Sequence, residues 1–132
     1  MTPQAVLIDT NVVSYLYRND SRAATYRSAL VGRRGLISFQ TYAELMVWAG
    51  SWSNAKRVHL QRWVSRRFGF LPHTPAVTDA WVAATLSARR NGQPIAAADA
   101  WIAATAMNAG LLFLTADKND FLGVDGLKLL QV

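Results

Sequence analysis

The stretch AVLIDTN, residues 5–11, combines a compact apolar run with an abrupt change to polar residues. Residues 5–8 are short, wholly apolar and partly branched, which predicts a strand. Asp9 follows this strand directly, and Thr10 is a suitable opening residue for a helix over residues 11–18. The stretch therefore predicts a strand that ends at a carboxylate and leads straight into a helix.

The rest of the chain repeats this alternation of short apolar runs and longer amphipathic segments. Such alternation predicts an α/β fold, in which a central, mainly parallel sheet is flanked by helices. We expect one domain over residues 1–132, with no linker, repeat or low-complexity segment. Further strands are expected at residues 35–38, 68–71 and 111–114, with a last, edge-like strand at 127–130, and further helices at residues 21–31, 40–49, 53–67, 78–91 and 98–109. Residues 111–114 are wholly apolar, so this strand is expected in the centre of a parallel sheet.

The composition excludes several kinds of site. Hydrophobic residues make up 52% of the 132 residues, which is enough for a real core, and the chain contains no cysteine. Without cysteine there is no disulfide framework, no thiolate zinc site and no cysteine nucleophile. We expect a cytoplasmic protein, because the first residues do not resemble a signal peptide and no apolar run is long enough to span a bilayer.

Positive charge is concentrated in the first half of the chain. The net charge is +6, from 14 basic and 8 acidic residues, and between residues 18 and 67 the only acids are Asp20 and Glu44. A basic half suggests a polyanionic partner such as RNA, although a solvated basic face kept for solubility explains the charge equally well. The candidates for contacts with RNA are Arg33, Arg34, Arg62, Arg66 and Arg67.

Four of the few acids occupy unusual positions. Asp9 and Asp117 follow predicted strands, so parallel pairing would bring both to the carboxyl edge of the sheet, where open α/β folds bind their ligands. Asp99 and Glu44 lie inside otherwise uncharged, apolar helices. Each acid taken singly is also explained as a cap, a turn residue or half of an ion pair. Together, however, the four predict an all-oxygen site for a hard cation, Mg²⁺ or Mn²⁺.

Four segments of the chain resemble, in order, the four motif regions of PIN domains, and are most similar to the VapC-type toxins of prokaryotic toxin–antitoxin pairs. The segments are LIDTNVVSYL (residues 7–16), QTYAELMVWA (40–49), AAADAWIAATAMNAG (96–110) and LFLTADKNDFLGVDGLKLL (112–130). Together they extend over nearly the whole chain. The ordered set, at these separations, is far more specific than any one of the motifs.

The resemblance implies a Mg²⁺- or Mn²⁺-dependent endoribonuclease that hydrolyses RNA phosphodiesters with a metal-activated water. It assigns Asp9, Glu44, Asp99 and Asp117 as catalytic and metal-binding acids, with Asn11 and Thr115 supporting them. Asp120 belongs to the same motif as Asp117 and is the alternative fourth acid. His59 and His73 have no role in such a mechanism and are expected to be surface or partly packed residues.

The resemblance also implies partners. A VapB-like antitoxin would lay a helix in a groove on two early helices, and a second copy of the chain would form a homodimer. The residues of this region are Tyr15, Leu16, Tyr42, Leu45, Met46 and Trp48, and ordinary core packing is the alternative interpretation of them. Two other interpretations of the acids stay open. One is a DNA- or structure-specific nuclease of the same fold, and the other is a non-enzymatic Mg²⁺-binding α/β module.

Overall fold

The computed structural model describes residues 4–132 and contains one parallel sheet. Its strands are β1 (Gln4–Ile8), β2 (Arg33–Ser38), β3 (Gly69–Leu71) and β4 (Leu112–Leu114), in the order β3-β2-β1-β4. β1 is internal, since Leu7 pairs with Leu36 on one side and with Phe113 on the other. The expectation that residues 111–114 form a central strand was wrong, because β4 ends the sheet. Its apolar side chains are still covered, since the tail around Leu129 lies against Phe113. The predicted α/β fold with a parallel sheet is confirmed.

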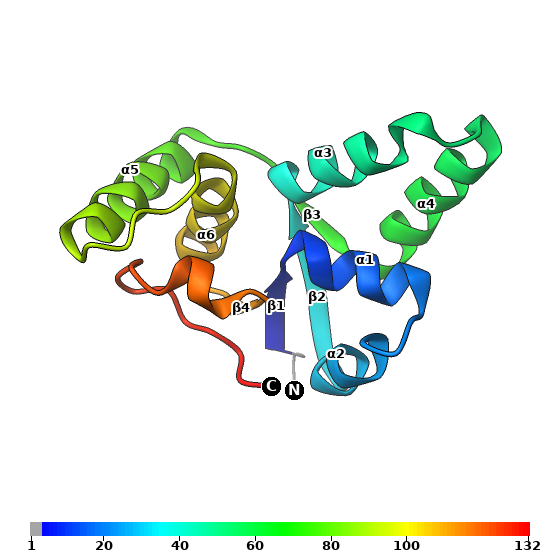
Figure 1. Ribbon diagram of the computed structural model, residues 1–132, viewed down its shortest axis with the longest axis horizontal. Coiled ribbons are helices and arrows are strands. Elements are labelled where there is room, and N and C mark those ends of the chain that lie inside the picture. Colours follow the sequence, from blue (N-terminus) through cyan, green and yellow to red (C-terminus); the bar gives the residue numbers. More distant parts are fainter. Residues whose placement is uncertain (1–3) are drawn as a thin grey trace.

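Helices cover both faces of this sheet (Figure 1). Helices α1, α3 and α4 lie to the right of the strands in that view, and α5 and α6 lie to the left. The helices are α1 (Thr10–Arg18), α2 (Ala23–Ala29), α3 (Phe39–Trp48), α4 (Asn54–Arg67), α5 (Pro75–Arg90) and α6 (Ala97–Ala109), with short 3-10 turns η1 (Ala49–Ser51) and η2 (Lys118–Phe121). Within residues 4–132, no helix has the length and apolar character needed to cross a membrane.

The alternation of side chains along β1 divides the core into two layers. Val6 and Ile8 pack into a cluster with residues of α1, α3 and α4, whereas Leu7 packs on the opposite face against Ile102 of α6 and Phe113. All three β1 side chains are fully buried. A strand buried on both faces explains why the sequence run is continuously apolar and does not alternate with polar residues.

Polar caps fix the positions at which helices begin. The Ser38 side chain caps α3 by accepting a hydrogen bond from the Thr41 backbone N–H, at 3.1 Å. Thr74 caps α5 in the same way, through the N–H of Val77, and Pro75 occupies the first turn. The helix predicted to begin at residue 78 therefore begins at Pro75, because proline at the first helical position needs no N–H partner and has a helical φ.

The expected strand at residues 127–130 was wrong. Leu129 forms only an isolated parallel bridge with Phe113, supported by hydrogen bonds from Phe113 N to the Lys128 carbonyl and from Leu130 N to the Phe113 carbonyl, both 2.8 Å. β4 has only three residues, so it offers few groups for pairing at this edge. The tail does lie at the sheet edge, but it is not a strand of the sheet.

The loop after β4 is fixed against α5 at a close approach of two backbones. A Cβ on Gly123 would lie 2.6 Å from the Gln93 carbonyl oxygen and 3.0 Å from Ala88 Cα. The Asn91 side-chain amide also donates to the Gly123 carbonyl oxygen, at 2.8 Å. The position of the preceding residues, which include Asp117 and Asp120, therefore depends on a residue without a side chain at 123.

We expect Gly123→Ala to lower the free energy of unfolding by about 1–3 kcal/mol, because neither backbone can move aside as a flexible side chain would. Gly50→Ala is the control, since a Cβ there meets nothing within 4 Å. That variant should change stability by less than about 1 kcal/mol. Urea unfolding measures both, and equal stability of the two variants would contradict the close packing at Gly123.

Candidate active site

Asp9 is the buried centre of the site. It follows β1 directly and is only 5% exposed. Its Oδ1 accepts a hydrogen bond from the Thr10 backbone N–H (2.8 Å), and its Oδ2 accepts one from Thr115 Oγ1 (2.7 Å). Thr115 follows β4, and β1 and β4 are parallel neighbours, so their carboxyl ends meet. The sheet topology thus brings residues 106 positions apart into contact.

The surroundings of Asp9 favour its neutral form. Burial is the main cause and raises the pKa of Asp9 from 3.8 to about 6. The hydrogen bonds from Thr115 and Thr10 act in the opposite direction, whereas the negative charges of Asp99 and Asp117 raise the pKa further. A positive charge placed near Asp9 would therefore stabilise its charged form.

Two hydrogen bonds connect Asp117 with residues next to Asp9. Its Oδ2 accepts a hydrogen bond from Asn11 Nδ2 (2.6 Å), and its backbone N–H donates to Thr115 Oγ1 (3.0 Å). Thr115 therefore bridges Asp9 and Asp117, while Asn11, on the first turn of α1, holds Asp117 from the other side. The two residues predicted to support the acids both contact them.

Glu44 reaches the site from α3. Its Oε1 accepts a hydrogen bond from Thr10 Oγ1, and its Oε2 accepts one from Gln40 Nε2 (3.3 Å). The buried Thr41 hydroxyl lies 3.0 Å from Thr10 Oγ1. Thr10 therefore connects Asp9, through its backbone, with Glu44, through its side chain. Sequence reasoning treated Thr10 only as the start of a helix, although its place between Asp9 and Asn11 was a usable signal.

Asp99 approaches from the other layer, in the first turn of α6. It is half-buried, and burial is the main cause of its raised pKa, with smaller contributions from Asp120, Glu44 and Asp117. Asp99 and the exposed Asp120 also line one cavity of about 360 Å³ beside Gln93 and Asn119. Both candidates for the fourth acid thus influence Asp99, but of the two only Asp117 also influences Asp9.

None of these acids has a cationic partner within the chain that the structure describes. The two salt bridges found between residues 4 and 132 join Arg22 to Asp20 and Arg90 to Asp125. An ion pair therefore does not explain why the charged Glu44 lies in an apolar helix. In the same residues, no three Asp, Glu or His side chains lie close enough to hold a metal ion, so a cation would have to draw the carboxylates closer together. The oxygen-only donor set fits Mg²⁺ or Mn²⁺.

The other predicted residues lie away from the acids. Arg33 and Arg67 line one large cavity, Arg62 and Arg66 line an adjoining one with Arg67, and Arg34 is exposed on β2. The two histidines are exposed and have local partners. His59 Nδ1 lies 2.8 Å from the Tyr17 hydroxyl, and His73 Nε2 lies 2.7 Å from Thr78 Oγ1.

Comparison with known proteins identifies the fold. The family model for the PIN domain matches residues 6–127. A chain of FitAcB from Neisseria gonorrhoeae superposes with a TM-score of 0.76 at 28% identity, covering 96% of each chain. A chain of VapBC-5, from the VapBC family of toxin–antitoxin systems of Mycobacterium tuberculosis, gives 0.72 at 25% identity, covering 98% of this chain and 100% of that one.

VapBC-1 from nontypeable Haemophilus influenzae gives a TM-score of 0.80 at 24% identity and covers 96% of both chains. No curated protein matches the sequence. The family model spans nearly all of the described chain, and its boundaries enclose every acid discussed above. The protein belongs to the PIN domain family.

Proposed function

We propose that this protein is a metal-dependent endoribonuclease and the toxin of a toxin–antitoxin pair. The observation that carries the proposal is the buried Asp9, which faces Asp99 and Asp117 with no cation beside it in the described part of the chain. Like charges held this close to one another lower the stability of the fold, and a bound cation would remove that cost. The similarity to VapBC structures supports the toxin assignment.

Asp9, Glu44, Asp99 and Asp117 would hold one or two Mg²⁺ or Mn²⁺ ions, and Asp120 is the alternative to Asp117. When bound, such an ion lowers the pKa of a water molecule and neutralises charge on the phosphate and on the leaving oxygen. No side chain then has to act as a nucleophile. This agrees with the positions of His59 and His73, which have local hydrogen-bond partners outside the site.

The chain's own residues orient the acids. Thr115 donates to Asp9 and accepts from the backbone of Asp117, so one hydroxyl sets the spacing of two carboxylates. Asn11 likewise donates a hydrogen bond to the Asp117 carboxylate, and Thr10 donates one to the Glu44 carboxylate. Because each of these acids already accepts a hydrogen bond, its orientation is largely fixed before any ligand arrives.

Replacing the acids tests the nuclease proposal. Asp9→Asn and Asp99→Asn should each reduce RNA cleavage by more than about 100-fold, because loss of an outer-shell partner alone costs about 10- to 100-fold. Asp79→Asn, which changes an exposed acid on α5, should cleave like the unaltered protein. EDTA should stop cleavage by the unaltered protein and by the Asp79 variant. Cleavage is measured on a labelled RNA, with circular dichroism to check the fold.

Two results would overturn the mechanism: full activity of either acid variant, or cleavage that persists in EDTA. DNA of the same sequence should be cut much more slowly than the RNA. Equal cutting of both strands would favour the DNA- or structure-specific alternative. Binding of Mn²⁺ without cleavage of any substrate would favour the non-enzymatic module.

The pKa of Asp9 predicts how stability depends on pH without metal. Folding raises this pKa above its unfolded value, so its contribution is fully present below about pH 4 and is lost as pH rises through about 6. In EDTA, the stability of Asp9→Asn relative to the unaltered protein should therefore be greater at pH 8 than at pH 4 by on the order of 1–3 kcal/mol. The loss of a hydrogen-bond acceptor in Asn lowers the stability equally at both pH values and does not affect this difference. Urea unfolding at both pH values measures the difference, and a relative stability that does not change with pH would contradict the origin given for the shift.

We infer a VapB-like antitoxin as partner, with a second copy of the chain forming a homodimer. A cavity of about 260 Å³ between α1 and α3 is lined by Asn11, Ser14, Arg18, Leu45 and Trp48, and it adjoins the acids through Asn11 and Thr10. An antitoxin helix placed there would lie against the residues that orient Asp9, Glu44 and Asp117. This position would explain how a bound protein prevents cleavage.

Expression in bacteria tests the toxin assignment. The unaltered chain expressed alone should arrest growth, because uncontrolled cleavage depletes cellular RNA. The Asp9→Asn variant, expressed to the same level, should not. Growth curves with immunoblots measure both, and an arrest that the variant still causes would separate toxicity from the carboxylates.

A further inference from the structure

A second large cavity lies at the opposite, amino-terminal edge of the sheet. Its volume is about 570 Å³, within the about 300–1,000 Å³ usual for small-molecule sites. Its walls come from the ends of α1, α2 and α4 and from the beginning of β2. Leu16 in the cavity wall lies six positions after Thr10, which is beside the acids, and this is about 9 Å along α1.

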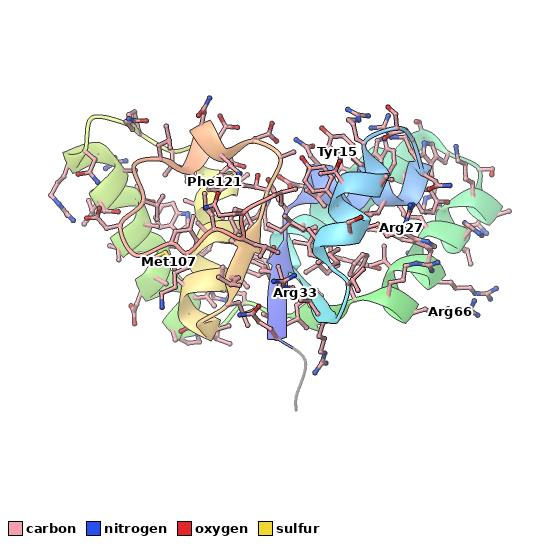
Figure 2. The ribbon with its side chains drawn as sticks, turned by 90° about the horizontal axis from the view of Figure 1, so that it is seen from below. Tyr15, Arg27, Arg33, Arg66, Met107 and Phe121 are labelled. Carbon is pink, nitrogen blue, oxygen red and sulfur yellow. The ribbon has the colours of Figure 1, made fainter. Side chains whose placement is uncertain are left out.

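Three arginines and no acid line this cavity. They are Arg27, Arg33 and Arg67, and neither salt bridge found in residues 4–132 involves them. Arg33 is held in place, since its Nη1 donates to the Ala29 carbonyl oxygen (2.7 Å) and its Nε to Gln4 Oε1 (3.2 Å). Figure 2 shows Arg27 and Arg33 on the same face, seen from below. Positioned guanidinium groups without carboxylate partners suit a phosphate.

Aromatic rings form another part of the wall. Trp63 meets Tyr17 edge-on at a centroid distance of 5.1 Å and Phe68 edge-on at 5.6 Å, and all three line the cavity. The Arg67 guanidinium lies over the Trp63 ring, 4.8 Å from its centroid. Rings of this kind provide flat surfaces on which a nucleobase stacks irrespective of its identity.

We propose that this cavity binds a nucleotide, with the phosphate on Arg27 and Arg33 and the base against the rings near Arg67. Two features on one wall, a cationic group without acids and an aromatic surface, match the two halves of that ligand. An acidic protein segment would satisfy the arginines but would leave the aromatic wall without a planar partner. The nucleotide can be a free mononucleotide or part of an RNA strand, since both present the same chemistry.

Calorimetry in EDTA at low salt tests the proposal independently of cleavage, because no metal is available at the carboxylates. Adenosine 5′-monophosphate should bind to the unaltered protein at one site and about tenfold more tightly than ribose 5-phosphate, which lacks the base. Arg33→Ala and Arg67→Ala should each weaken binding about tenfold. Arg90→Ala, which removes an exposed arginine paired with Asp125, should leave it unchanged.

A short oligoribonucleotide identifies the source of the nucleotide. If it binds more tightly than the mononucleotide, with the same dependence on Arg33 and Arg67, the nucleotide is part of an RNA strand. Equal or weaker binding of the oligoribonucleotide identifies a free nucleotide, and no binding of the mononucleotide would overturn the proposal. Arg67 and Arg27 are exposed, so their alanine variants carry the test should Arg33→Ala fail to fold. Equal affinity for ribose 5-phosphate, no effect of the arginine variants, or binding of polyglutamate alone would overturn the proposal.

Discussion

The hydrogen bond from Thr115 to the buried carboxylate of Asp9 joins two neighbouring strands at the edge of the sheet where the acids lie. It ties the end of β1 to the end of β4, and the Thr115 hydroxyl also accepts the N–H of Asp117. Burial works against the charge of Asp9, whereas this hydrogen bond and that of Thr10 favour it. Through the two hydrogen bonds of Thr115, Asp9 and Asp117 are held at a fixed position relative to each other.

The sequence predicted the structure best where the type of a residue and its place next to a strand or in a helix determined its surroundings. The uninterrupted apolar run at residues 5–8 predicted a strand, and Val6, Leu7 and Ile8 of β1 are all buried. Asp9 and Asp117 were predicted to follow strands, and the carboxyl ends of parallel strands lie at the same edge of the sheet. This was enough to place both acids at the carboxyl edge. Asp99 and Glu44 stood out because charge is rare in apolar helices.

The sequence was less informative where a tertiary contact decided the outcome. Thr10 has the composition of an ordinary helix start, and only the position of α3 shows that its hydroxyl reaches Glu44. The tail at residues 127–130 has an apolar pattern typical of a strand, but β4 is too short to pair with more than one of its residues. The start of α5 was missed for a local reason, because the Thr74–Pro75 pair is itself a strong signal for a helix beginning.

The two edges of the sheet have opposite electrostatic character, and this follows from how few acids the chain contains. Most of the acids discussed here lie at the carboxyl edge, while arginines without acidic partners line the cavity at the amino edge. An anionic polymer is repelled by bare carboxylates but attracted by the arginines, so it would be held first at the basic edge. A cation at the acids would remove the repulsion there. Binding of the polymer at the carboxyl edge would then depend on the metal, whereas binding at the amino edge would not. The two edges can therefore be studied separately in one protein, with a chelator as the only change.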